Sequence, residues 1–201
     1  MTKLEKIVEY ATGKLTTEVT AHDFSHSLRV MKIANHIGKN SDMDMDVDLE
    51  IIKVAGLTHD LIDKKVVKNV DEAITELKET LLTIGYTDSQ VDHVIDIIQN
   101  VSFSNGKIPT TQEGKIVQDA DRLEAVGAIA IARTFAYGGK LNRIIYEEGN
   151  SECGIAHFYD KLLLLKDKMN TDIGKQLAKE RHEFMERFLE QFYKEWKLED
   201  L

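Results

Sequence analysis

The sequence predicts an all-α fold. The chain of 201 residues contains a single proline and 12 glycines, so it has few residues that break helices. Apolar residues recur three or four positions apart over long stretches, and almost no stretch alternates apolar and polar residues as a strand would. The composition, 42% hydrophobic and 30% charged, is that of an ordinary globular protein. We therefore expect helices packed around a sizeable core.

The expected helices of the first half of the chain surround one that is more apolar than the others. Residues 49–61 are apolar around most of the helix circumference, which is typical of a helix buried by others on several sides. We therefore expect this helix to be central. The helix before it is expected to begin at a cap from Asp23 or Ser25 and to run up to Gly38. The expected helices are residues 4–13, 23–38, 49–61, 71–84 and 89–101.

The second half of the chain is expected to hold one long helix and a helical tail. Residues 115–137 carry apolar and small side chains on one side and end at Gly138 and Gly139. The tail is expected to comprise residues 155–165 and a last helix from about residue 171 to 196. Aromatic residues recur on that helix at helical spacing, which favours core packing, with a homodimer contact as the alternative. They are Phe184, Phe188, Phe192, Tyr193 and Trp196.

Charge and composition exclude several classes of function. The formal net charge of -9 argues against a protein that binds nucleic acid, although a metal ion and a few basic residues can still hold a small nucleotide. No apolar run approaches the about 18 residues that cross a membrane. The first ten residues alternate charged and apolar side chains instead of forming a signal peptide. Cys153, the single cysteine, cannot form an internal disulfide, so we expect a cytoplasmic protein.

Four polar residues lie on helices that otherwise present apolar faces to the core. They are His26, His59, Asp60 and Asp121. Burying a histidine beside a carboxylate is costly unless a partner binds both, and a divalent metal ion is the simplest such partner. Nitrogen and carboxylate ligands without a thiolate favour Mn²⁺, Fe²⁺, Co²⁺, Ni²⁺, Zn²⁺ or Mg²⁺. The sequence therefore predicts one site for a divalent cation, with room for water and a phosphate oxygen.

Asp63 lies one helical turn after Asp60 and is expected on the same side of the helix. From there its carboxylate could reach a water molecule or a leaving oxygen at the predicted metal site. We therefore expect Asp63 to act as the general acid or base of a hydrolytic reaction.

Three segments, in this order along the chain, resemble the HD superfamily of metal-dependent phosphohydrolases. They are residues 22–30 (HDFSHSLRV), 58–60 (THD) and 118–128 (QDADRLEAVGA). Residues 131–135 (IARTF), with Gly138 and Gly139, extend the likeness, which covers roughly residues 20–140. The segments look most like those of small bacterial stand-alone HD proteins that act on nucleotides.

The resemblance implies a fold, a ligand set and an activity. The fold would be an HD-domain helical bundle with extra C-terminal helices. Because no linker or composition break divides the chain, residues 1–201 are expected to form a single domain with its core at about residues 20–140. The family's ligands, a histidine, a His-Asp doublet and a distant aspartate, correspond to His26, His59, Asp60 and Asp121. Asp63 stands where several HD nucleotidases place an acidic catalytic residue.

Several other residues near these motifs can be interpreted in more than one way. Arg29, Lys64 and Arg122 are candidate contacts for substrate phosphate, but Arg29 could instead pair with a carboxylate, and lysines after a helix end are usually solvated. Lys65 shares the reading of Lys64. His22 is expected to act as a cap or a supporting donor instead of a ligand. His93 has apolar neighbours and is expected to pack in the fold, which favours a single metal ion over two.

The resulting hypothesis is a metal-dependent phosphohydrolase that acts on a nucleotide or a related small phosphate ester. The resemblance favours conversion of a nucleoside triphosphate to the monophosphate and pyrophosphate. Dephosphorylation of a nucleoside 5'-monophosphate is the close alternative. A module that keeps the metal site and senses a ligand without catalysis, and a purely structural helical scaffold, are the alternatives from other classes.

Overall fold

The computed structural model describes residues 1–15, 23–41, 46–64, 66–101 and 107–201. Within these ranges the chain forms α-helices and short 3₁₀ segments and contains no strand, which confirms the predicted all-α fold. Its contacts divide the chain into two compact units, residues 1–121 and 122–201. The elements are α1 (Lys3–Leu15), α2 (Phe24–Asn40), α3 (Leu49–Thr58), η1 (His59–Ile62), α4 (Val70–Ile84), α5 (Asp88–Val101), α6 (Gln112–Leu123), α7 (Ala128–Lys140), α8 (Ala156–Asp160), η3 (Leu162–Leu164), η4 (Lys166–Lys168) and α9 (Asp172–Trp196).

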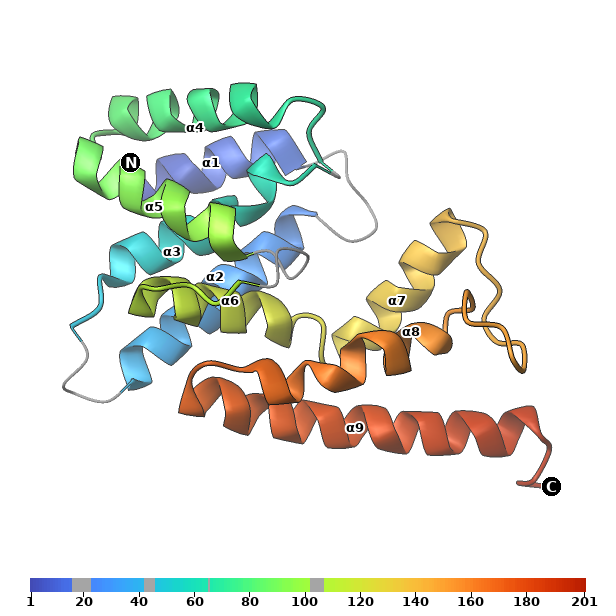
Figure 1. Cartoon of the computed structure of the whole chain (residues 1–201). Coiled ribbons are helices and arrows are strands. Elements are labelled where there is room, and N and C mark those ends of the chain that lie inside the picture. Colours follow the sequence, from blue (N-terminus) through green and yellow to red (C-terminus); the bar gives the residue numbers. More distant parts are fainter. Residues whose placement is uncertain (16–22, 42–45, 65, 102–106) are drawn as a thin grey trace. The chain divides into compact units, whose positions relative to one another are not determined.

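Helix α3 lies at the centre of the first unit, as its sequence predicts. It contacts α1, α2 and α5, and Figure 1 shows it between these helices. Its buried residues come from every side of the helix: Ile51, Ile52, Val54, Ala55, Gly56, Leu57 and Thr58. A helix with no polar face cannot lie at a surface, so α3 determines where its neighbours pack.

Helices α2 and α3 pack unusually close together because α3 carries a glycine at the crossing. A Cβ atom built on Gly56 would lie 2.9 Å from the Cα atom of Met31 in α2, and Gly56 is buried. That distance is shorter than any real contact of a Cβ atom, so only glycine allows this approach. The crossing brings the first turn of α2 near the last turn of α3.

Side-chain caps begin these two helices. The Asp23 carboxylate accepts a hydrogen bond from the backbone N–H of His26 at 2.6 Å, which confirms Asp23 as the cap of α2. The Asp48 carboxylate accepts from the N–H groups of Glu50 and Ile51 and caps α3. The Tyr86 hydroxyl, just after α4, donates to Glu50 at 3.0 Å and ties the turn between α4 and α5 to the start of α3.

The prediction of one long helix over residues 115–137 is wrong. Helix α6 ends at Leu123, and α7 begins at Ala128 after a turn. Gly127 lies in this turn with φ at +100°, a conformation that favours glycine. A Cβ atom there would also meet the stem of Arg181 at 3.1 Å.

Two arginines stabilise the end of α6 in place of a continuing helix. The Arg181 guanidinium donates to the carbonyl of Leu123 at 2.6 Å, and Arg133 donates to the carbonyl of Glu124 at 3.1 Å. The last carbonyls of a helix have no partner within it, so cations placed there are favourable.

The aromatic residues of α9 pack within the second unit. Phe188 stacks on Phe158 with ring centroids 5.8 Å apart and lies 6.3 Å from Phe135. Further along α9, Trp196 lies 5.3 Å from Tyr146. Phe188, Phe192 and Tyr193 are half-buried, whereas Phe184 and Trp196 stay 43% and 51% exposed, so the stripe is only partly buried. The homodimer contact stays a prediction.

Across the described parts of the chain, the helices are too short or too polar for any of them to cross a membrane.

We expect Gly56→Ala to lower the free energy of unfolding by about 1 to 3 kcal/mol, because the added methyl group must push α2 away from α3. Urea denaturation followed by circular dichroism measures this change. Gly13→Ala is the matched control, since nothing lies within 4 Å of a Cβ atom at that exposed position of α1. It should leave stability unchanged or raise it by up to about 1 kcal/mol. Equal stabilities of the two variants would contradict the close crossing.

Candidate metal centre

The first histidine of the site lies in the first turn of α2. His26 follows the cap residue Asp23 by three positions, and its side chain is 2% exposed. The hydrogen bond from its backbone N–H to Asp23 fixes the helix start and with it the direction in which the imidazole points.

His59 and Asp60 lie just after α3, where the backbone tightens into the 3₁₀ segment η1. The Nδ1 atom of His59 lies 2.9 Å from the carbonyl oxygen of Gly56. A carbonyl can only accept a hydrogen bond, so Nδ1 carries the proton and Nε2 presents its lone pair. Histidines that bind metals are oriented in this way by a carbonyl or carboxylate behind the ring.

The two imidazoles and two carboxylates converge. Nε2 of His26 lies 3.5 Å from a carboxylate oxygen of Asp60 and 3.5 Å from one of Asp121. Nε2 of His59 lies 3.4 Å and 3.7 Å from oxygens of the same two residues. The two rings meet edge to face, with centroids 5.2 Å apart. The structure therefore brings together all four residues that the sequence predicts as ligands.

The donor atoms suit a divalent cation. One ligand atom from each of His26, His59 and Asp121 lies within 4.8 Å of the other two, and Asp60 contacts both histidines without joining that tighter group. Nε2 of His59 is buried and has no hydrogen-bond partner in the described part of the chain. A buried lone pair of this kind, facing two carboxylates, is the arrangement that a metal ion completes.

Asp121 is the most open of the four side chains. Its side chain is 27% exposed, against 2% for His26 and about 5% for Asp60, so the site opens to solvent on the side of Asp121. Burial raises the pKa of the Asp121 carboxyl, but the hydrogen bond to His26 and the electrostatic attraction of the two imidazoles outweigh this and lower its pKa to about 2. Asp121 is therefore ionised at neutral pH, as a metal ligand must be.

Asp63 lies at the end of η1, where the backbone becomes extended (φ -72°, ψ 134°). Its backbone N–H donates to the carbonyl of Asp60, and its own carbonyl accepts from Val66 and Val67. These bonds hold the residue beside the ligand pair while its side chain stays partly exposed. Its role as general acid or base stays a prediction.

The predicted phosphate contacts lie in different settings. Arg29 is half-buried, and its guanidinium donates to the Ser25 hydroxyl at 3.1 Å. Lys64 is exposed. Arg122 is 7% exposed and donates to the backbone carbonyl of Lys168, a contact that anchors it within the second unit. A role in phosphate binding stays a prediction for all three.

His93, the other histidine weighed as a ligand, lies near an acidic residue of α6. His93 lies with Nε2 3.7 Å from a carboxylate oxygen of Glu113. Among the residues that the structure describes, no second group of three histidine, cysteine or acidic side chains is close enough to hold an ion. His22 and Lys65 lie outside the described residues.

Sequence reasoning missed the part that Gly56 plays in this site. Its carbonyl orients His59, and its missing side chain allows α2, which carries His26, to approach α3. The signal in the sequence is a glycine inside an apolar helix, three positions before a histidine. A glycine costs about 1 kcal/mol there relative to alanine, so its presence calls for a reason.

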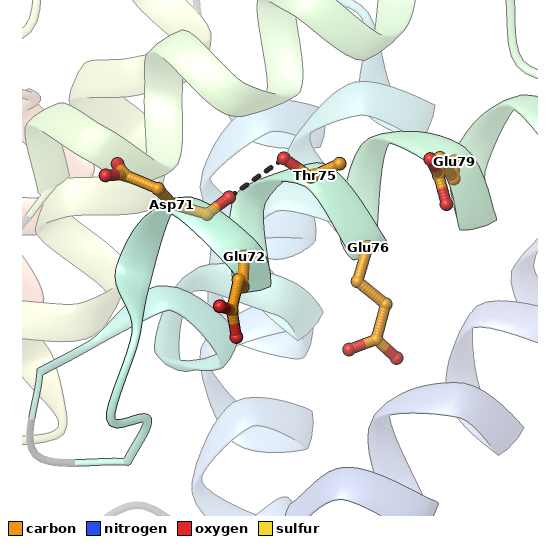
Figure 2. A pocket seen from close by; sticks show the side chains of 5 residues that line it. All are labelled: Asp71, Glu72, Thr75, Glu76 and Glu79. Atoms are coloured by element: carbon orange, nitrogen blue, oxygen red, sulfur yellow. Dashed lines mark hydrogen bonds between the residues drawn. The ribbon is translucent and has the colours of Figure 1, made fainter.

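A hollow on α4 contains none of the predicted site residues. Figure 2 shows its lining, which comes from one helix and is mostly acidic: Asp71, Glu72, Thr75, Glu76 and Glu79. Glu76 pairs with Lys14 of α1 at 2.5 Å. Four carboxylates without a histidine or an arginine repel a phosphate, so the hollow is no candidate for a nucleotide site.

The helices bring two histidines and two aspartates together in an all-α fold. This arrangement is typical of helical proteins that bind a metal ion. Comparison with known families is consistent with this class. Residues 23–126 match the HD domain family, and this segment contains all four predicted ligands. The chain belongs to the HD domain family.

Relatives in bacteria share nearly the whole chain. The YpgQ protein of Bacillus subtilis is 42% identical over 195 residues, which cover 95% of this chain and 92% of the relative. The crystal structure of YpgQ in complex with ADP has a TM-score of 0.82 at 38% identity and covers 96% of this chain and 97% of that one. An HD-superfamily hydrolase from Bacillus thuringiensis has a TM-score of 0.79 at 38% identity, with 97% of each chain covered.

We expect His59→Ala to abolish stoichiometric metal binding, because it removes a buried ligand whose orientation the fold has already fixed. The purified chain should hold about one equivalent of a divalent metal by elemental analysis, and the variant should hold almost none.

His36→Ala is the matched control, since His36 is an exposed histidine of α2. It should retain the metal content of the unaltered chain. Equal loss in both variants would point to a general effect of histidine number and not to this centre.

Proposed function

We propose that this protein is a metal-dependent phosphohydrolase that acts on nucleotides. The observation that carries the proposal is the convergence of His26, His59, Asp60 and Asp121, whose buried nitrogen and oxygen donors suit one divalent cation. The HD-superfamily hydrolase from Bacillus thuringiensis, similar over 97% of this chain, supports hydrolysis as the reaction class.

The four side chains would hold Mn²⁺, Fe²⁺, Co²⁺, Ni²⁺, Zn²⁺ or Mg²⁺, an ion that polarises a phosphoryl oxygen and lowers the pKa of water. The chain's own groups do the rest. Asp63, beside the ligand pair and partly exposed, would accept the proton of the attacking water or give one to the leaving oxygen. The partial exposure of Asp121 leaves a path by which a phosphate group can reach the centre.

Binding of the remaining phosphates calls for basic groups at the rim of the site. Arg29 lies one turn after His26 on α2, and Lys64 follows Asp63 directly. A guanidinium can hold two phosphate oxygens at once, whereas a lysine acts as a point charge. We assign Arg29 and Lys64 to this role. Arg122, next to Asp121, would contribute through its charge, because its guanidinium already binds the carbonyl of Lys168.

The complex of Bacillus subtilis YpgQ with ADP supports a nucleotide as the substrate. The family resemblance favours a nucleoside triphosphate, cleaved to the monophosphate and pyrophosphate. Hydrolysis of a nucleoside 5'-monophosphate is the alternative, and the products separate the two reactions. The formal net charge of -9 also fits a small substrate better than nucleic acid.

We expect the chain loaded with Mn²⁺ to hydrolyse at least one member of a panel of nucleoside mono-, di- and triphosphates. Chromatography of the nucleotide products, with separate assays for phosphate and pyrophosphate, identifies the bond that is cleaved. Pyrophosphate with a nucleoside monophosphate supports the leading reaction, and phosphate with a nucleoside supports the alternative. No turnover of any member would contradict the proposal and favour a module that senses nucleotides.

We expect Asp63→Asn to lower kcat by about 100-fold or more while metal content stays at one equivalent, because an amide cannot transfer the proton. Kinetics and elemental analysis on the same sample test this. Asp88→Asn, which changes an exposed aspartate of α5, is the matched control and should keep full activity. Loss of the metal from Asp63→Asn would show that this carboxylate helps to bind the ion, and would contradict its role in proton transfer.

A further inference from the structure

The position of Asp121 depends on how α6 is held. His59 and Asp60 are neighbours in the chain, and α2 packs closely against α3, so three of the four donors are placed by one crossing. Asp121 belongs to α6, a helix much further along the chain. The apolar residues of α6 that seal it into the core are Ile116, Val117, Ala120 and Leu123, all fully buried.

Apolar contacts are not directional, so they restrain the rotation and sliding of a helix less specifically than a hydrogen bond does. A metal site is less tolerant, since ligand distances must agree within about 0.2 Å. A polar contact on α6 near Asp121 would supply the missing directional restraint.

Gln118 makes such a contact. Its side chain is fully buried, and its amide nitrogen donates to the carbonyl of Lys107 at 2.9 Å. The same nitrogen lies 3.3 Å and 3.4 Å from the carbonyls of Asn100 and Val101, the last two residues of α5. These carbonyls have no partner within α5, because a helix leaves its final carbonyl groups unbonded. Gln118 therefore links α6 to the end of α5 and to residue 107.

The link lies one helical turn from the metal ligand. Gln118 and Asp121 are three positions apart, so their side chains leave the same face of α6. An amide held by carbonyls from two separate segments fixes both the rotation of α6 about its axis and its height along that axis. Rotation and height are the two quantities that place the Asp121 carboxylate against the two Nε2 atoms.

We infer that Gln118 is a positioning residue for the metal centre, which holds Asp121 in register with His26 and His59. The inference rests on the proposed function, since it needs a metal at these residues. An apolar side chain would fill this buried position without the cost of burying an amide. Positioning Asp121 gives a reason for a glutamine there.

Gln118→Met tests the inference, because methionine has a similar length and volume but no donor for the three carbonyls. We expect the affinity for Mn²⁺, measured by titration calorimetry, to fall by about 10-fold or more. With Co²⁺ bound, the visible absorption spectrum should change, because it reports the arrangement of the ligands. Both measurements are made at a temperature where circular dichroism shows the variant to be folded.

Gln118→Asn provides a second variant. It keeps the amide donors and shortens the side chain by one methylene group, so it should lose affinity to a smaller extent than Gln118→Met. Ile37→Ala controls for loss of stability, because Ile37 is fully buried near the end of α2 that is remote from His26. It should unfold at a lower temperature and yet bind Mn²⁺ as the unaltered chain does.

Gln118→Met that binds Mn²⁺ within twofold of the unaltered chain, with the same Co²⁺ spectrum, would overturn the inference and leave Gln118 a structural role. Loss of affinity in Ile37→Ala equal to that in Gln118→Met would overturn it too. An unaltered chain that binds Mn²⁺ but turns over no nucleotide would contradict the proposed hydrolysis and leave these metal measurements unaffected. An unaltered chain that binds no metal would remove the metal centre itself. In that case there is no ligand for Gln118 to position.

Discussion

Charge is the constraint on which the centre of this protein depends. Asp60 and Asp121 bring two carboxylates against two imidazoles, and three of these four side chains are almost completely buried. Two carboxylates this close together raise each other's pKa unless positive charge lies between them. Burial raises the pKa of Asp121, but the hydrogen bond to His26 and the attraction of the neighbouring imidazoles lower it by more, so this carboxylate stays ionised. A divalent ion would supply the same compensation without protonating the imidazoles, and the nitrogen lone pairs would then become ligands.

The helices meet this constraint through their ends. His26 lies in the first turn of α2, His59 and Asp60 follow the last turn of α3, and Asp121 lies in the last turn of α6. The C-terminal end of a helix carries partial negative charge, so α3 and α6 both favour a cation at the point where they meet. The N-terminal end of α2 carries the opposite charge, and the carboxylate of Asp23 occupies it. The crossing at Gly56 keeps these ends together, because a larger residue would separate α2 from α3.

The sequence predicts most of the first unit, because each of its helices contains its own signals. The Asp23 cap, the apolar circumference of residues 49–61 and the glycine after residue 84 mark helix boundaries locally, and the structure places them within a few residues. The four predicted donors also converge. They could be predicted because their order along the chain matches the pattern of the family. The break between α6 and α7 could not be predicted in this way. Its partners, Arg133 and Arg181, come from later helices, and no local pattern shows that their side chains return to the carbonyls of residues 123 and 124.

The same distinction between local and distant information explains what supports the centre. A sequence pattern identifies the metal ligands, because histidine and aspartate stand out on an apolar helix. It does not identify the groups that orient these ligands. Gly56 acts through its backbone carbonyl, and the side-chain amide of Gln118 binds a carbonyl from another segment, so neither is a donor to the metal that residue type would indicate. Both are placed so that a small movement of one helix would move a donor: Gly56 behind His59, Gln118 one turn before Asp121. The precision of a site built from three helices therefore depends on polar contacts made outside it, where one helix meets the end of another.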